Sequence, residues 1–134
     1  MRTATALILL GLALAPVAAA QQAPTAQPAI LSPTEGATVA SPVTVTVKPA
    51  DADSPGMAGM GSGAHLHLFV DSKLPTAGSM VPMDARHIHL QHGETATTLS
   101  LPPGRHTVQV IEGTMGHTIT AGAPHSDLVT FEVK

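Results

Sequence analysis

The chain has 134 residues, a formal net charge of −3, no cysteine, tryptophan or tyrosine, and two phenylalanines. This length fits a single domain, and the weak negative charge excludes the electrostatic footprint of a nucleic-acid-binding protein. Without cysteine there is no disulfide, iron–sulfur cluster or thiol nucleophile. The residue types in excess are histidine, with eight copies, and methionine, with six.

The N-terminus has the pattern of an export signal. Arg2 precedes an apolar run from Ala4 to Ala15, and the small residues Ala18 to Ala20 stand before Gln21. This order is typical of a secretory signal peptide, and the run is shorter than the roughly 20 residues of a membrane span. We predict a signal peptide over residues 1–20, a disordered linker over 21–29, and a periplasmic or secreted domain over 30–134 with no membrane span.

Short segments of alternating apolar and polar residues follow the linker, separated by proline and glycine turns, and no helical period is present among them. About seven short strands in a domain of this size are typical of a β-sandwich. We therefore predict an all-β fold, a small immunoglobulin-like antiparallel β-sandwich, with an open β-barrel as the alternative. The predicted strands are Ile30–Leu31, Val43–Val47, His65–Val70, His87–Leu90, Thr95–Leu101, His106–Ile111 and Leu128–Val133.

Two of these strands carry paired histidines. Residues two apart in a strand point to the same face, so we expect His65 and His67 to point outward together, away from the leucines beside them. His87 and His89 have the same spacing. Two converging imidazoles suit zinc, copper, nickel or iron. If the two strands are neighbours, four imidazoles meet on one face, but the sequence leaves their adjacency open.

Methionine pairs precede both histidine pairs. Met57 and Met60 come before the first pair, and Met80 and Met83 come before the second. A thioether is a soft ligand that favours Cu(I), whereas imidazole also serves Cu(II). A further methionine two residues before His117 makes this histidine a candidate auxiliary ligand. The alternative for Met80 and Met83 is a packing role at the end of the sandwich, because methionine often fills cores.

The remaining histidines have weaker patterns. His106 shares its parity with Val108 and Val110, so we predict a structural histidine that faces inward at the start of a strand. His92 and His125 fall in loops or at strand ends and receive no role.

Several motifs resemble a known family. The segments in question are His65–Asp71, His87–Thr95, Leu101–Val110 and the downstream His117. Over roughly residues 62–134 they are similar to a family of small bacterial secreted domains catalogued as domain of unknown function 4399. The resemblance implies a secreted β-domain with recurring histidines, and it implies no activity. Glycine is usual in the family where His92 stands, and the methionine pairs are not part of its motifs.

We expect an extracytoplasmic metal-binding protein that captures, chaperones or detoxifies copper, with zinc as the alternative metal and a copper-accepting protein as its partner. The alternatives are a non-catalytic envelope interaction domain with surface histidines and, less favoured, a redox copper or zinc metalloenzyme. We predict no enzyme, because no Ser–His–Asp pattern is apparent and the histidine pairs have few carboxylates nearby. The expected ligands are His65, His67, His87, His89, Met57, Met60, Met80, Met83 and His117.

Overall fold

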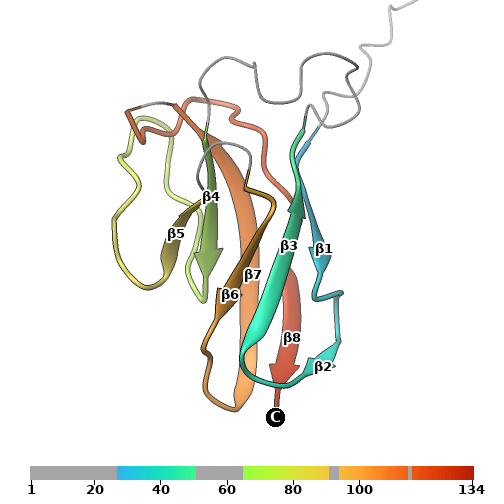
Figure 1. Ribbon diagram of the computed structural model, residues 1–134. Coiled ribbons are helices and arrows are strands. Elements are labelled where there is room, and N and C mark those ends of the chain that lie inside the picture. Colours follow the sequence, from blue (N-terminus) through green and yellow to red (C-terminus); the bar gives the residue numbers. More distant parts are fainter. Residues whose placement is uncertain (1–26, 51–64, 91–93, 115) are drawn as a thin grey trace, which may run out of the picture.

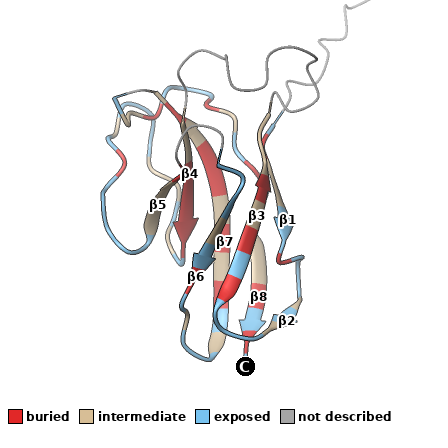
Figure 2. Cartoon of the chain, in the orientation of Figure 1, coloured by how far each residue is buried: buried red, intermediate tan, exposed pale blue. Residues whose placement is uncertain are grey.

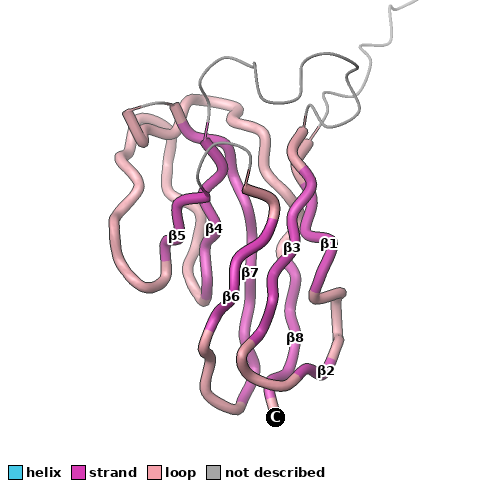
Figure 3. Tube along the Cα trace, in the orientation of Figure 1, coloured by secondary structure: helices cyan, strands magenta, loops and turns pink. Residues whose placement is uncertain are grey.

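The structure is a computed structural model that describes residues 27–50, 65–90, 94–114 and 116–134. Within these ranges the chain consists of strands and loops, without a helix (Figure 3). None of the described segments is therefore a helix with the length and hydrophobicity of a membrane span. The strands are β1 (Ala29–Ser32), β2 (Thr38–Val39), β3 (Val43–Lys48), β4 (His65–Val70), β5 (His87–Leu90), β6 (Ala96–Leu99), β7 (Gly104–Gly113) and β8 (Val129–Val133).

The strands form two sheets that face each other (Figure 1). One sheet has the order β1-β3-β6, and the other has the order β2-β8-β7-β4-β5. In an immunoglobulin-like sandwich, a sheet with strands A, B and E faces a sheet with strands C, F and G. Here β1, β3 and β6 take the places of A, B and E, and β4, β7 and β8 take those of C, F and G. β5 lies beside β4, as an added strand does in the variable type. The predicted β-sandwich is confirmed, and the alternative barrel is wrong because the described strands divide between two separate sheets.

Most strands lie where the sequence predicts them, and the exception is β2. Strands β4 and β5 have the predicted bounds, whereas β7 extends two residues beyond its prediction at each end. β2 has only two residues, too few to show an alternating pattern, and it pairs parallel with β8. Backbone amides of Glu132 and Lys134 donate to the carbonyls of Ala37 and Val39 at 2.8 and 3.0 Å, which holds β2 in place.

The sandwich core lies between the two sheets. In β3 the valines are buried and the intervening threonines are more exposed, as strict alternation predicts (Figure 2). Each fully buried Val or Leu side chain contributes about 1.5–3 kcal/mol to stability. The buried members are Val43, Val45, Val47, Leu68, Val70, Leu90, Leu99, Val108, Val110, Phe131 and Val133.

A second, smaller apolar cluster covers the outer face of the five-stranded sheet. Phe69 and Ile111 point to this face from β4 and β7, and Val81, Ile119 and Ala123 pack on them from two connecting segments. These segments, residues 71–86 and 114–128, also pair with each other through backbone hydrogen bonds. The expectation that this face meets solvent is therefore wrong for β4, which is buried on both sides from His67 to Val70. Strand alternation identifies the outer face but carries no information about the loops that fold over it.

Candidate metal centre

The two strands with paired histidines are neighbours in the sheet. β4 pairs antiparallel with β5, and the register places His67 directly opposite His89. Residues directly opposite in an antiparallel pair project to the same face, with side chains about 5 Å apart. The adjacency that the sequence left open is thus settled by the register, which brings these two imidazoles together.

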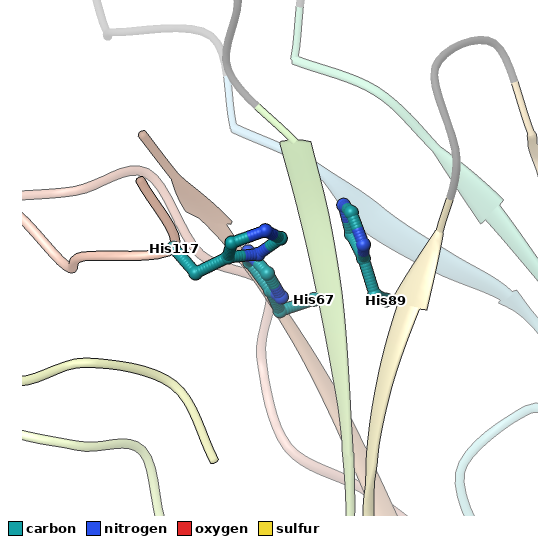
Figure 4. A group of neighbouring side chains, drawn as sticks. All are labelled: His67, His89 and His117. Atoms are coloured by element: carbon teal, nitrogen blue, oxygen red, sulfur yellow. The ribbon is translucent and has the colours of Figure 1, made fainter. Parts of the chain in front are cut away.

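A third histidine reaches the same place from a loop. His117 follows β7 and adopts a positive φ of 57°, a region that histidine tolerates better than most residues. Its amide donates to the Thr114 carbonyl at 2.9 Å, and its carbonyl accepts the amide of Val81 at 2.8 Å. These contacts fix the turn so that the His117 ring points toward His67 and His89 (Figure 4).

The three imidazoles are close enough to share one metal ion. One ring nitrogen from each of His67, His89 and His117 lies within 4.8 Å of the other two. The ring centroids are 5.0 Å apart for His67 and His89, and 4.5 Å apart for His89 and His117. Nitrogens bound tetrahedrally at about 2.1 Å stand about 3.4 Å apart, so small side-chain rotations would complete the site. We call these three residues the histidine cluster.

His65 lies beside the histidine cluster. Its ring meets that of His89 edge to face, with centroids 4.7 Å apart, and stacks on the ring of His117 at 5.9 Å. Its nitrogens are not among the atoms that lie within 4.8 Å of one another. His65 is therefore a ring neighbour of the site and lies outside its set of convergent nitrogens.

Two nitrogens of the cluster are buried without a hydrogen bond. His67 is 1% exposed, and Nε2 of His67 and Nε2 of His89 have no hydrogen-bond partner among the described residues. Buried polar atoms in native proteins are usually satisfied, and leaving one unpaired costs about 1–3 kcal/mol. A bound metal ion would use both lone pairs and remove this cost.

The same burial keeps His67 and His89 neutral. Desolvation, followed by repulsion from His89, His117 and His65, lowers the pKa of His67 to about 4. Desolvation and the neighbouring histidines also lower the pKa of His89, against a smaller opposing effect of Glu94. Neutral imidazole is the form that binds metal, so His67 and His89 are ready to coordinate at neutral pH.

Gly113 provides the space that His67 occupies. This residue ends β7 and lies opposite His65 in the register. A Cβ atom placed on Gly113 would lie 2.8 Å from both Cδ2 and Nε2 of His67, which is closer than such atoms approach. The sequence analysis did not identify Gly113, although a glycine at the end of a strand pattern often marks a close approach of the backbone.

His87 is held away from the cluster by its own hydrogen bonds. Its Nδ1 lies 2.7 Å from Oδ1 of Asp84, and its Nε2 lies 3.1 Å from Oγ of Ser72. A carboxylate only accepts, so Nδ1 donates to Asp84 and Nε2 accepts the Ser72 hydroxyl. The ring also packs edge to face on Phe69. The sequence analysis missed this Ser–His–Asp arrangement because Ser72 lies 15 residues from His87 in the chain, and here it ties β5 to the turn after β4.

The two described methionines lie at the surface near the cluster. Met80 is 70% exposed and Met83 is 86% exposed, so the alternative that they fill the core is wrong. Met83 lines an open cleft of about 330 Å³, and Met57 and Met60 lie outside the described residues. The other residues that line the cleft are His67, Val81, Pro82, Asp84, His87, His89 and His117.

His106 has the predicted structural role. It is 8% exposed, its Nδ1 donates to Oδ2 of Asp71 at 2.7 Å, and its Nε2 donates to the Pro102 carbonyl at 2.8 Å. Since both partners only accept, the doubly protonated ring fits best, and the bond to Asp71 raises the pKa of His106 against the effect of burial. His125 is exposed, and its Nδ1 donates to the nearby Ala123 carbonyl. His92 lies outside the described residues.

Comparisons with known proteins agree with the resemblance seen in the motifs. No curated protein and no solved structure gives a significant match to the chain. One family profile matches residues 43–134, which include β3 to β8 and every member of the histidine cluster. The chain therefore belongs to the family described as Domain of unknown function (DUF4399).

Proposed function

We propose that this protein binds copper as cargo outside the cytoplasm, through His67, His89 and His117. The observation that carries the proposal is the meeting of three imidazoles from β4, β5 and a loop, with ligand atoms within 4.8 Å of one another. Two of the three side chains bring a buried nitrogen without a hydrogen bond. A site that only stabilised the fold would satisfy such atoms with protein partners.

The ligand types favour copper over zinc. Neutral imidazole suits both ions, but the cleft also carries the thioether of Met83, which is 86% exposed, whereas the Asp84 carboxylate beside it is engaged by the Arg86 amide and by His87. Thioethers bind Cu(I) well and zinc poorly. His65 lies beside the cluster and adds a further imidazole, a group that suits Cu(II), to its surroundings.

Cargo binding is favoured over catalysis by the hydrogen bonds of a carboxylate that lines the cleft. Asp84 lines the same cleft and would be the natural proton donor or acceptor of a metalloenzyme. Its Oδ1 already accepts bonds from the Arg86 amide at 2.8 Å and from His87. These bonds favour the charged form and lower the pKa of Asp84, so its carboxylate is occupied in holding its own turn and is a poor proton acceptor.

The sequence supports an extracytoplasmic site. The proposed signal peptide over residues 1–20 directs export, and an oxidising compartment favours ligands other than thiols. Histidine and methionine bind copper without the risk of disulfide formation, which fits a chain that has no cysteine. A copper-accepting protein in the same compartment is the proposed partner.

The test is a competitive titration of the tag-free protein with Cu(I), Cu(II) and Zn(II) against chelators of known affinity. We expect one tightly bound copper ion that outranks zinc, and weaker binding at pH 4 than at pH 7 because protonated imidazole cannot coordinate. Replacing His89 and His117 together by Ala should weaken copper binding at least about 100-fold, the loss of about 2.7 kcal/mol.

The matched control is His125→Ala, which removes an exposed histidine that lies outside the cluster. Copper binding that survives the double substitution, or that falls equally with His125→Ala, would contradict the assignment of the site. Preference for zinc would contradict the choice of copper, and absence of bound metal in the folded protein would favour an envelope interaction domain.

A further inference from the structure

The mouth of the cleft carries an exposed methionine. Met83 is 86% exposed and lines the same hollow as all three members of the histidine cluster. Most large apolar side chains gain free energy by burial, so a methionine this exposed beside a metal-binding group is available for contact with solutes. Met80, three residues earlier, is 70% exposed but does not line the cleft.

The backbone on both sides of Met83 is fixed. Val81 is 4% exposed and donates its amide to the His117 carbonyl at 2.8 Å, which ties the segment to the loop that carries a cluster ligand. On the other side, Asp84 accepts the Arg86 amide and bonds to His87 on β5. Met83 thus has a defined position at the cleft while its unbranched side chain keeps its rotational freedom.

A thioether at this place has a specific chemical use. It binds Cu(I) and other soft monovalent ions, holds zinc weakly, and needs no deprotonation at any physiological pH. A site of three imidazoles, one of them fully buried, releases its ion slowly when no other ligand takes it over on the way to solvent. A soft ligand at the opening of the cleft binds the ion between solvent and the imidazoles, and this intermediate lowers the barrier to exchange.

We propose that Met83 is the exchange ligand of the histidine cluster, through which Cu(I) enters the site and leaves it for an accepting protein. The inference rests on the proposed function and adds the path by which the ion enters and leaves the cluster, and the preference of that path for Cu(I). During transfer the Met83 sulfur forms a bond to the incoming ion as a donor ligand leaves, and the imidazoles then replace the sulfur. The metal remains Cu(I) throughout, so no oxidant or reductant takes part.

The experiment compares rates with equilibria in the Met83→Leu protein. Leucine keeps the volume and apolar character of an exposed side chain, so the fold should be retained, as thermal unfolding will show. Cu(I) is supplied anaerobically on a chromophoric chelator, and both its capture and its removal by excess chelator are followed by stopped-flow absorbance. We expect both rates to fall about tenfold, which is the effect of 1.4 kcal/mol on a barrier.

Three controls separate the exchange role from other roles. The equilibrium affinity for Cu(I) should change less than threefold, Zn(II) capture should keep its rate, and Met80→Leu should exchange Cu(I) like the wild type. Unchanged Cu(I) rates in Met83→Leu would overturn the proposal. So would a tenfold loss of affinity with an unchanged capture rate, since Met83 would then be a resident ligand.

Failure of the proposed function gives a different result. A wild-type protein that takes up no Cu(I) overturns both proposals, because there is then no ion to exchange. Tight Cu(I) binding by the wild type with identical kinetics in Met83→Leu overturns the exchange ligand alone.

Discussion

His67 is the residue on which the site depends most, because it combines full burial with a nitrogen that has no hydrogen bond. Its neighbours His89 and His117 are only partly buried. The sequence identified all three as candidate ligands from their spacing and their residue type. It could not show that His87, with the same spacing, is engaged by Asp84 and Ser72, because the first contact depends on the local turn before β5 and the second joins residues 15 apart.

Gly113→Ala should weaken metal binding by displacing His67. The added Cβ would lie 2.8 Å from the ring, so either the imidazole or β7 must move. Overpacking of this kind costs about 1–3 kcal/mol, and we expect copper affinity to fall at least about tenfold with some loss of thermal stability. The measurements are competitive titration and thermal unfolding of the metal-free protein.

Gly116→Ala is the control for this substitution. A Cβ at Gly116 would meet only Thr114 Oγ1 at 3.8 Å, an ordinary contact, although this residue lies next to His117 in the chain. Equal losses in both variants would mean that the loop, and not the space beside His67, governs the site.

At the scale of elements, register and turns bring the ligands together. Strands β3, β4, β5 and β7 could be predicted because each has four or more residues with an alternating or chemically distinct pattern. β2 could not, since two residues show no period and its position depends on backbone bonds to β8. The pairing of segments 71–86 and 114–128 was equally hidden, because irregular segments have no period that reports their contacts.

The turn after β4 depends on a bond between Asp71 and β7. Asp71 has a φ of 49°, and its carboxylate accepts the Thr107 amide at 2.8 Å and the His106 ring at 2.7 Å. Since the raised pKa of His106 exceeds that of the unfolded chain, this contact contributes stability fully below about pH 6.5 and loses it as the pH rises through the folded pKa.

Asp71→Asn should therefore lower the pKa of His106 toward its ordinary value, as followed by NMR of the imidazole protons. Asparagine tolerates the positive φ, so the turn should survive. The loss of stability should be about 1–2 kcal/mol near pH 5.5 and smaller at pH 8. Asp127→Asn, at another exposed aspartate, should change neither quantity, and a loss that grows with pH would contradict the assignment.

At the scale of the molecule, the five-stranded sheet supports two separate packings. Its inner face belongs to the sandwich core, and its outer face carries the second apolar cluster and the histidine cluster. The sandwich followed from strand count and alternation, which depend on local residue order. The covered outer face did not follow, because it requires two long connections to fold back over β4 and β7.

This arrangement makes the metal-free protein sensitive to acid. The pKa of His67 is about 4 in the folded chain against 6.5 in the unfolded chain, so between these values only the unfolded state takes up the proton. Stability should fall as the pH drops from 6.5 to 4, by at most about 1.4 kcal/mol per pH unit for this group. His106 adds no slope in this window because both states hold its proton.

Denaturant unfolding of the metal-free protein from pH 7 to 4 checks this expectation, with His67→Gln as the variant that should lose part of the slope. Copper at 100 times its dissociation constant should stabilise the protein by about 2.7 kcal/mol at pH 7, and the same copper concentration should stabilise it much less at pH 4. Equal slopes in the wild type and His67→Gln would assign the acid sensitivity to other groups.

The residues on the two faces of the five-stranded sheet can be substituted independently of each other. Val45 lies between the sheets and His117 lies on the opposite side of the five-stranded sheet, and the two apolar clusters on these sides share no described residue. Free-energy effects of distant sites without shared partners are nearly additive. The outer face can therefore be re-specified for another ion, by evolution or by an engineer, while the sandwich beneath it keeps its stability.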